Sequence, residues 1–176
     1  MKLFFLPILL FFAIQLSIAQ PQTESKSIFE KRHEVKMEVI KLLSVPIIET
    51  TYEFVHDRNK GYGAYLLVNL DQSKDYNETF SLTPFFRMYF SRDEQYGAKG
   101  FFVEAFSSFF TGPSSRNGLG KDKNAFDVSL GFSLGQKWIN SSGFVFEYRF
   151  GIGRNLLGNT REDFLAKGGL CVGYRF

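Results

Sequence analysis

Long stretches of the sequence alternate between apolar and polar positions. Residues 80–90 read FSLTPFFRMYF, and residues 126–138 read FDVSLGFSLGQKW. A period of two over this length is typical of β-strands that have two different faces. Six further segments follow the pattern less strictly. The eight predicted strands are residues 34–43, 47–55, 61–70, 80–90, 100–111, 126–138, 143–153 and 167–176.

The two faces of these strands differ in charge. From the second strand onward, one face carries no charged residue, whereas the other collects glycine, serine, threonine and the charges. A soluble barrel turns its apolar face inward, but an apolar outside with a polar inside is typical of outer-membrane barrels. The strand lengths also suit the ~9–11 residues that cross a bilayer. The charges that we expect to form a network in the lumen are Lys36, Glu38, Glu49, Glu53, Arg87, Glu104, Asp127, Lys137, Glu147, Arg149 and Arg175.

The pattern therefore predicts an all-β fold, an eight-stranded antiparallel up-and-down transmembrane β-barrel. The barrel must close, because an open edge in hydrocarbon leaves backbone groups unpaired. Six acids and five bases share a lumen just wide enough for side chains, so we expect paired charges that plug it. Two positions conflict with regular strands: Lys41 falls on the lipid face, and Pro84 cannot donate a ladder hydrogen bond. We expect a β-bulge near each of them.

The beginning of the chain has the composition of a secretory signal peptide. A lysine at position 2 precedes an apolar run over residues 3–14, and Ser17 and Ala19 supply small residues for cleavage after residue 19. The run is shorter than the ~20 residues of a membrane-spanning helix, which favours a cleaved signal over an anchor. We expect export and the following organisation: a signal peptide at 1–19, a periplasmic lead-in at 20–33 and the barrel at 34–176.

The end of the chain has alternating apolar residues and a terminal aromatic residue, features typical of an outer-membrane insertion signal. The residues concerned are Leu170, Val172, Tyr174 and Phe176. Together with the signal peptide and the strands, they resemble a family of small, uncharacterised outer-membrane β-barrels of Gram-negative bacteria. The segments that carry the resemblance are SLTP at 81–84, KGFFVE at 99–104, GFVFE at 143–147 and GYRF at 173–176.

The resemblance spans residues 34–176. It implies an eight-stranded barrel similar to outer-membrane proteins A and X, located in the cell outer membrane. It also implies the β-barrel assembly machinery of that membrane as a partner. It implies no established activity.

The composition excludes several other classes of protein. Aromatic residues make up 18% of the chain, which is too apolar for disorder and too rich in phenylalanine for a nucleic-acid module. The net charge of +3 is too small to indicate an acidic partner. The single cysteine, Cys171, excludes a disulfide framework and a multi-cysteine metal site. We expect no nucleic acid, metal or cofactor to bind.

The candidate catalytic groups are poorly placed for chemistry. A lipid-modifying barrel enzyme needs a histidine near a serine at the outer edge of the membrane, but His33 lies in the lead-in and His56 in a predicted periplasmic turn. Glu49 and Glu53 lie four residues apart on one strand, about 13 Å, which is too far for a glycosidase pair. We therefore expect that the protein is not an enzyme.

The expected function is a structural or loop-mediated interaction role in the outer membrane. Residues 112–123 form a polar, locally basic loop, which either contacts anionic lipopolysaccharide headgroups or is simply solvated. A narrow channel or carrier for a small solute is the first alternative, and a lipid-modifying enzyme is the second. The expected partners are outer-membrane lipids, lipopolysaccharide and the assembly machinery, while the partner of the external loops stays open.

Overall fold

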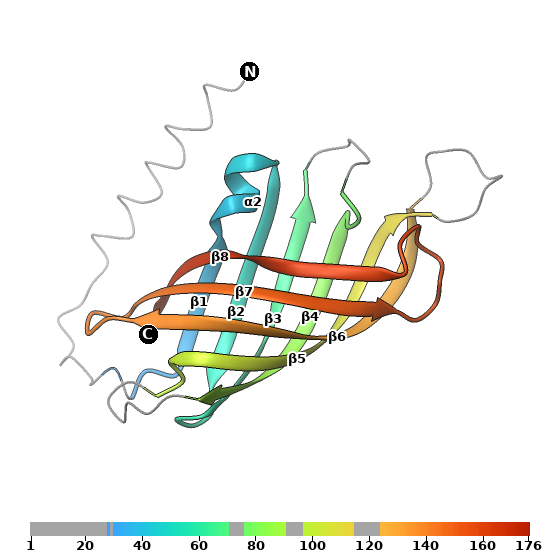
Figure 1. Cartoon of the computed structure of the whole chain (residues 1–176). Coiled ribbons are helices and arrows are strands. Elements are labelled where there is room, and N and C mark those ends of the chain that lie inside the picture. The colour runs from blue at the N-terminus through green and yellow to red at the C-terminus, as the bar shows by residue number, and fades with distance from the viewer. Residues whose placement is uncertain (1–27, 29, 71–75, 91–96, 115–123) are drawn as a thin grey trace, which may run out of the picture.

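The computed structural model describes residues 28, 30–70, 76–90, 97–114 and 124–176. The predicted signal peptide and most of the lead-in lie outside the described residues. Eight strands form one closed antiparallel barrel in up-and-down order (Figure 1), so the predicted barrel architecture is confirmed. The strands are β1 (His33–Glu38), β2 (Ile47–Val55), β3 (Lys60–Asn69), β4 (Phe80–Phe90), β5 (Gly100–Pro113), β6 (Asn124–Ile139), β7 (Phe144–Asn155) and β8 (Phe164–Arg175).

The two ends of the barrel are different. The start of β1 and the end of β8 lie together, where the backbones of His33 and Phe176 hydrogen-bond to each other. We call this the terminal end. The loop end carries the connections β3–β4, β5–β6 and β7–β8 and one short helix, α2 (Val39–Ser44) (Figure 1). Among the described residues, no helix is long and apolar enough to span a membrane.

The first strand is shorter than predicted. β1 ends at Glu38, and the chain then forms α2. The reason is a helix cap: the Glu38 carboxylate accepts the backbone N–H groups of Ile40 at 3.1 Å and Lys41 at 2.5 Å, which satisfies donors that a helix start leaves free. Lys41 therefore belongs to a helix. The expected strand over 34–43 is confirmed for residues 34–38 and wrong for residues 39–43, and the bulge expected at Lys41 is wrong.

The bulge expected at Pro84 is absent as well. Pro84 pairs with Ala64 of β3, in the same register as every other pair of those strands. Between β4 and β5 the pairing continues from Leu82–Phe109 to Phe85–Phe106 with no inserted residue. The missing N–H of proline removes one ladder bond, and the pairs on both sides hold the register without it.

The stagger of the strands follows from the register. The pairings that start at Glu34 of β1 run through Glu53, Gly63, Phe85, Phe106, Gly131 and Gly153 to Leu165 of β8. The direct partner of Glu34 on β8 is Arg175, ten residues further along the strand than Leu165. A closed barrel with such a stagger has strands that tilt against its axis, typically by ~35–45°. Residues far apart in sequence consequently meet at one level of the lumen.

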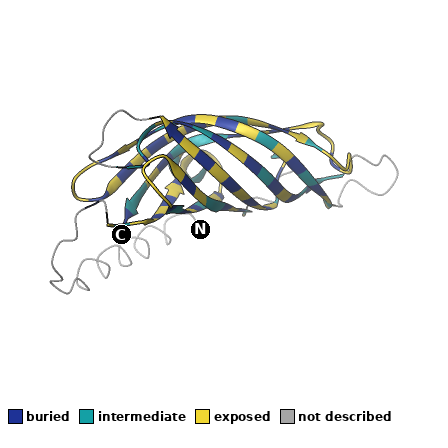
Figure 2. Cartoon of the chain, turned by 90° about the horizontal axis from the view of Figure 1, so that it is seen from below, coloured by how far each residue is buried: buried dark blue, intermediate teal, exposed yellow. Residues whose placement is uncertain are grey.

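Burial alternates along every strand (Figure 2). The outward side chains are mostly apolar, and in the middle of the wall Phe132 is 60% and Phe150 is 70% exposed. Within the strands, the outward-facing Lys and Arg side chains lie close to strand ends: Lys60 begins β3, and Arg154 is the last residue but one of β7. The inward side chains are polar or charged over much of the barrel. Polarity is thus inverted relative to a water-soluble barrel.

The lumen is filled by side chains. Large rings on β5 face glycines on β6, because nothing larger fits there. A Cβ atom at Gly135 would lie 2.4 Å from the Phe102 ring, and one at Gly131 would lie 2.5 Å from the Phe106 ring. This tight packing places the inward charges close to one another.

Candidate functional site

The structure places all the residues of the predicted lumen network on the inside. Their side chains are at most 1% exposed. They are Lys36, Glu38, Glu49, Glu53, Arg87, Glu104, Asp127, Lys137, Glu147, Arg149 and Arg175. Two further inward charges of the strands, Glu34 and Lys167, belong to the same interior.

Arg87 is the centre of the interior. Its Nε donates to Glu104 at 2.6 Å, and its Nη1 donates to Glu53 at 2.9 Å. Two parallel bonds of 2.7 and 2.8 Å join its guanidinium to Glu147. The ring of Phe102 lies 4.2 Å from the guanidinium carbon. A planar fork with several donors is suited to this role, since it can bind carboxylates on three sides.

Three further cations complete this arrangement. Lys36 Nζ lies 2.6 Å from Glu53 and 2.7 Å from Glu147, and Lys137 Nζ lies 2.9 Å from Glu34. Arg175 Nε donates to Glu34 at 2.7 Å. We call these residues the ionic cluster; its members are Glu34, Lys36, Glu53, Arg87, Glu104, Lys137, Glu147 and Arg175.

The ionic cluster is electrically balanced and links the wall of the barrel. Four carboxylates meet four cations, and the residues come from every strand except β3. β3 contributes Tyr65, whose hydroxyl donates to Glu104, while Tyr89 donates to Glu53 at 2.5 Å. A desolvated interior requires that its opposite charges pair and cancel, because an unpaired buried charge is costly.

A smaller group of charges lies closer to the loop end. Glu49 accepts from Lys41 of α2 at 2.5 Å and from Nη2 of Arg149. Lys167 Nζ donates to Glu78 at 2.5 Å and to Ser81 at 3.2 Å. Nε and Nη1 of Arg149 have no hydrogen-bond partner among the described residues.

Two predicted network members pair with backbone instead of cations. Glu38 caps α2, as described above. Asp127 accepts backbone N–H groups of Leu157 at 3.0 Å, Asn159 at 3.0 Å and Thr160 at 3.2 Å. Its carboxylate thereby holds the β7–β8 loop against β6. The expectation that all inward charges form ion pairs is therefore wrong for these two.

Sequence reasoning missed three charges of the interior. Glu34 lies two residues before Lys36 and therefore on the same face of the strand, so alternation could have found it. Lys167 is the first residue of the predicted strand 167–176, where a strand end gives no clear face, but β8 begins at Phe164 and carries Lys167 inward. Glu78 comes from the β3–β4 connection, and a loop residue that folds inward leaves no periodic signal.

The candidate catalytic residues are separated from one another. His33 Nδ1 hydrogen-bonds to the hydroxyl of Tyr52 at 2.8 Å on the exposed surface, and His56 lies beside Tyr62 at the terminal end. Glu49 and Glu53 belong to different ion pairs. Within the part of the chain that the structure describes, no cluster of His, Cys, Asp or Glu could hold a metal ion. Cys171 is a buried free thiol.

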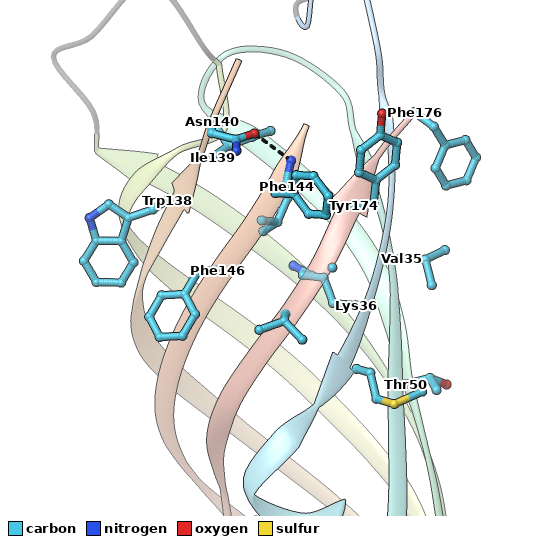
Figure 3. A pocket seen from close by; sticks show the side chains of 14 residues that line it. Val35, Lys36, Thr50, Trp138, Ile139, Asn140, Phe144, Phe146, Tyr174 and Phe176 are labelled. Atoms are coloured by element: carbon cyan, nitrogen blue, oxygen red, sulfur yellow. Dashed lines mark hydrogen bonds between the residues drawn. The ribbon is translucent and has the colours of Figure 1, made fainter. Parts of the chain in front are cut away.

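The residues of the predicted insertion signal lie on the outside of β8, except that Phe176 follows the strand. Val172 and Phe176 are exposed, and the Tyr174 ring meets that of Phe144 at 5.6 Å. The outer wall of β1, β6, β7 and β8 is hollowed here into a recess of about 1320 Å³ (Figure 3). Trp138 and Phe146 form part of its lining. The recess belongs to the apolar outer surface.

Comparison with known proteins found no match to a family model, to a curated protein or to a solved structure. The function must therefore be argued from the geometry of the barrel itself.

Proposed function

We propose that the protein is a barrel of the cell outer membrane with a structural or loop-mediated interaction role. The observation that carries this proposal is the inverted polarity of the wall. Aromatic and aliphatic side chains cover the outside of the strands, and eight mutually paired charges fill the inside. Monomeric proteins in water rarely expose contiguous apolar patches larger than a few hundred Å². A bilayer is the solvent that suits such a surface, with the terminal end in the periplasm.

The ionic cluster favours a closed lumen rather than an open channel. Its charges are bound to one another and to the wall, and rings such as Phe102 fill the space between them. An ion that crossed this level would have to separate several buried pairs, each costly to break. The remaining contact surface of the protein is its loop end. There, the basic segment 112–123 suits lipopolysaccharide headgroups, although residues 115–123 lie outside the described part of the chain.

The closed lumen predicts the result of a conductance measurement. The purified protein, inserted into planar lipid bilayers, is expected to give no steady current under conditions in which a porin conducts. The physical reason is that the ionic cluster leaves no water-filled path. A steady, reproducible conductance from the wild-type protein would overturn the closed lumen and favour the alternative, a narrow channel or carrier for a small solute.

The end of the last strand indicates a partner in the assembly of the barrel. The outward residues Val172, Tyr174 and Phe176 give the end of the chain an apolar surface with two aromatic rings, which resembles an outer-membrane insertion signal. We propose the assembly machinery of the outer membrane as this partner, and export through the signal peptide at 1–19 as the route to it.

A further inference from the structure

The wall of the barrel is incomplete near the loop end. β1 pairs with β8 only from Cys171 to Arg175, because β1 ends at Glu38. β8 continues to Phe164, so its stretch 164–170 has no β1 partner. On the other side, β1 pairs with β2 from Thr50 onward, which leaves Ile47–Glu49 without a β1 partner as well. The two edges flank the place of one missing strand, about 10 Å wide at twice the usual strand spacing.

α2 occupies this gap (Figure 1) and contacts both β2 and β8. Two side chains attach it. The Glu38 carboxylate, which caps the helix, also accepts the backbone N–H of Leu170 at 3.0 Å. Lys41 reaches Glu49 of β2 at 2.5 Å. Lys41 Nζ also lies 6.0 Å from the centre of the Tyr76 ring. Side-chain contacts thus attach the cover, whereas the rest of the wall is held by continuous ladders. Unpaired strand edges facing hydrocarbon need such a cover.

A buried cation with free donors lies behind the cover. The Glu49 carboxylate that binds Lys41 also binds Nη2 of Arg149. Arg149 is 1% exposed, and its Nε and Nη1 have no partner among the described residues. Lys41, Glu49 and Arg149 together carry one positive charge more than they balance. A single carboxylate beside Arg149 would balance this charge and accept a hydrogen bond from one of its free donors, Nε or Nη1.

Apolar side chains line part of the lumen between this group and the loop end. Leu67 is the direct cross-strand partner of Glu49, and Ile47 follows two residues further on. Leu165 faces inward from β8. All three side chains are at most 2% exposed. These side chains form an apolar strip beside the Lys167–Glu78 ion pair, and the strip suits a hydrocarbon chain.

We propose that the gap covered by α2 is a lateral portal, and that Arg149 binds the carboxylate of a fatty acid of about twelve carbons or more that enters from the outer leaflet. The acyl chain would lie against Ile47, Leu67 and Leu165 once α2 moves outward. The width of one missing strand favours a single chain over the several chains of a lipid A molecule. The proposal rests on the membrane placement proposed above, since a portal in this wall opens towards lipid.

The test uses the full barrel in phosphatidylcholine nanodiscs. Titration with dodecanoate is expected to saturate, whereas dodecanol and dodecyltrimethylammonium, which have the same chain length, do not. Arg149→Gln should weaken dodecanoate binding by about tenfold or more, the loss expected for a charge-assisted pair. Arg154→Gln, the same change at an exposed arginine of the same strand, should leave binding unchanged. Equal binding of all three amphiphiles, or equal effects of both variants, would overturn the proposal.

A second measurement locates the ligand and does not depend on whether Arg149→Gln folds. A fatty acid with a photoactivatable diazirine on its chain is expected to label the inward Leu67 and Ile47. Labelling confined to their outward neighbours Leu66 and Ile48 would show only surrounding lipid and would overturn the portal. Failure of the proposed function would appear differently, as a protein absent from the outer membrane.

Discussion

Replacement of Arg87 by alanine is expected to lower the free energy of unfolding by about 3–5 kcal/mol, the scale for removing one partner of a buried ion pair. The variant would leave Glu53, Glu104 and Glu147 with one cation fewer in a desolvated interior. It would also leave a space beside the Phe102 ring. Urea unfolding of the barrel in lipid vesicles, followed by fluorescence of the single tryptophan, Trp138, measures the change.

Two controls distinguish the loss of ion pairing at Arg87 from the effect of removing any arginine. Arg154→Ala, at an exposed position of β7, should change stability by less than about 0.5 kcal/mol, as surface substitutions usually do. In the Arg87→Ala background, Glu147→Gln should cost less than it does in the wild type, because the carboxylate has already lost one of the two cations that pair with it. Additive effects of the two substitutions would mean that the ionic cluster is not an energetic unit.

An arginine in place of Phe132 is expected to destabilise the barrel by about 2–4 kcal/mol in a bilayer. Phe132 lies in the middle of β6 and is 60% exposed on the outer wall. A guanidinium there would face the hydrocarbon centre, where no partner is available. The matched variant is Phe126→Arg, at the loop end of the same strand, where the expected cost falls to about 0–1 kcal/mol.

The informative quantity is the difference between the free-energy costs of arginine at Phe132 and at Phe126. A barrel surrounded by water would tolerate arginine equally well at both exposed positions. Refolding into lipid vesicles and equilibrium unfolding of both variants give the two free energies. Equal costs at Phe132 and Phe126 would remove the support for a membrane around this wall.

Alternation predicted most strands because it reports which face each side chain occupies. The bounds of β2 and β4 are those predicted from the pattern. β1 was predicted too long because residues 39–43 are largely apolar, and a short apolar run does not distinguish strand from helix. The helix cap formed by Glu38 favours the helix. Alternation places the Glu38 carboxylate in the lumen, but it does not predict that this carboxylate caps a helix.

Alternation could not predict which charges meet. Arg87 and Glu147 lie 60 positions apart, and their contact depends on the stagger of ten residues around the closed barrel. That stagger is a property of all eight pairings together, so no single segment contains it. The backbone pairing of Asp127 was hidden for a related reason, since it depends on how the β7–β8 loop folds over β6.

The central claim is that the chain forms a closed barrel in the outer membrane. Its most direct test is electrophoresis in dodecyl sulfate of protein from purified outer membranes, with and without boiling. We expect the protein in that fraction, with an unheated band that migrates differently from the boiled one, because a closed barrel with a paired interior resists the detergent until heated. Absence from the outer-membrane fraction, or identical mobility before and after boiling, would contradict the account.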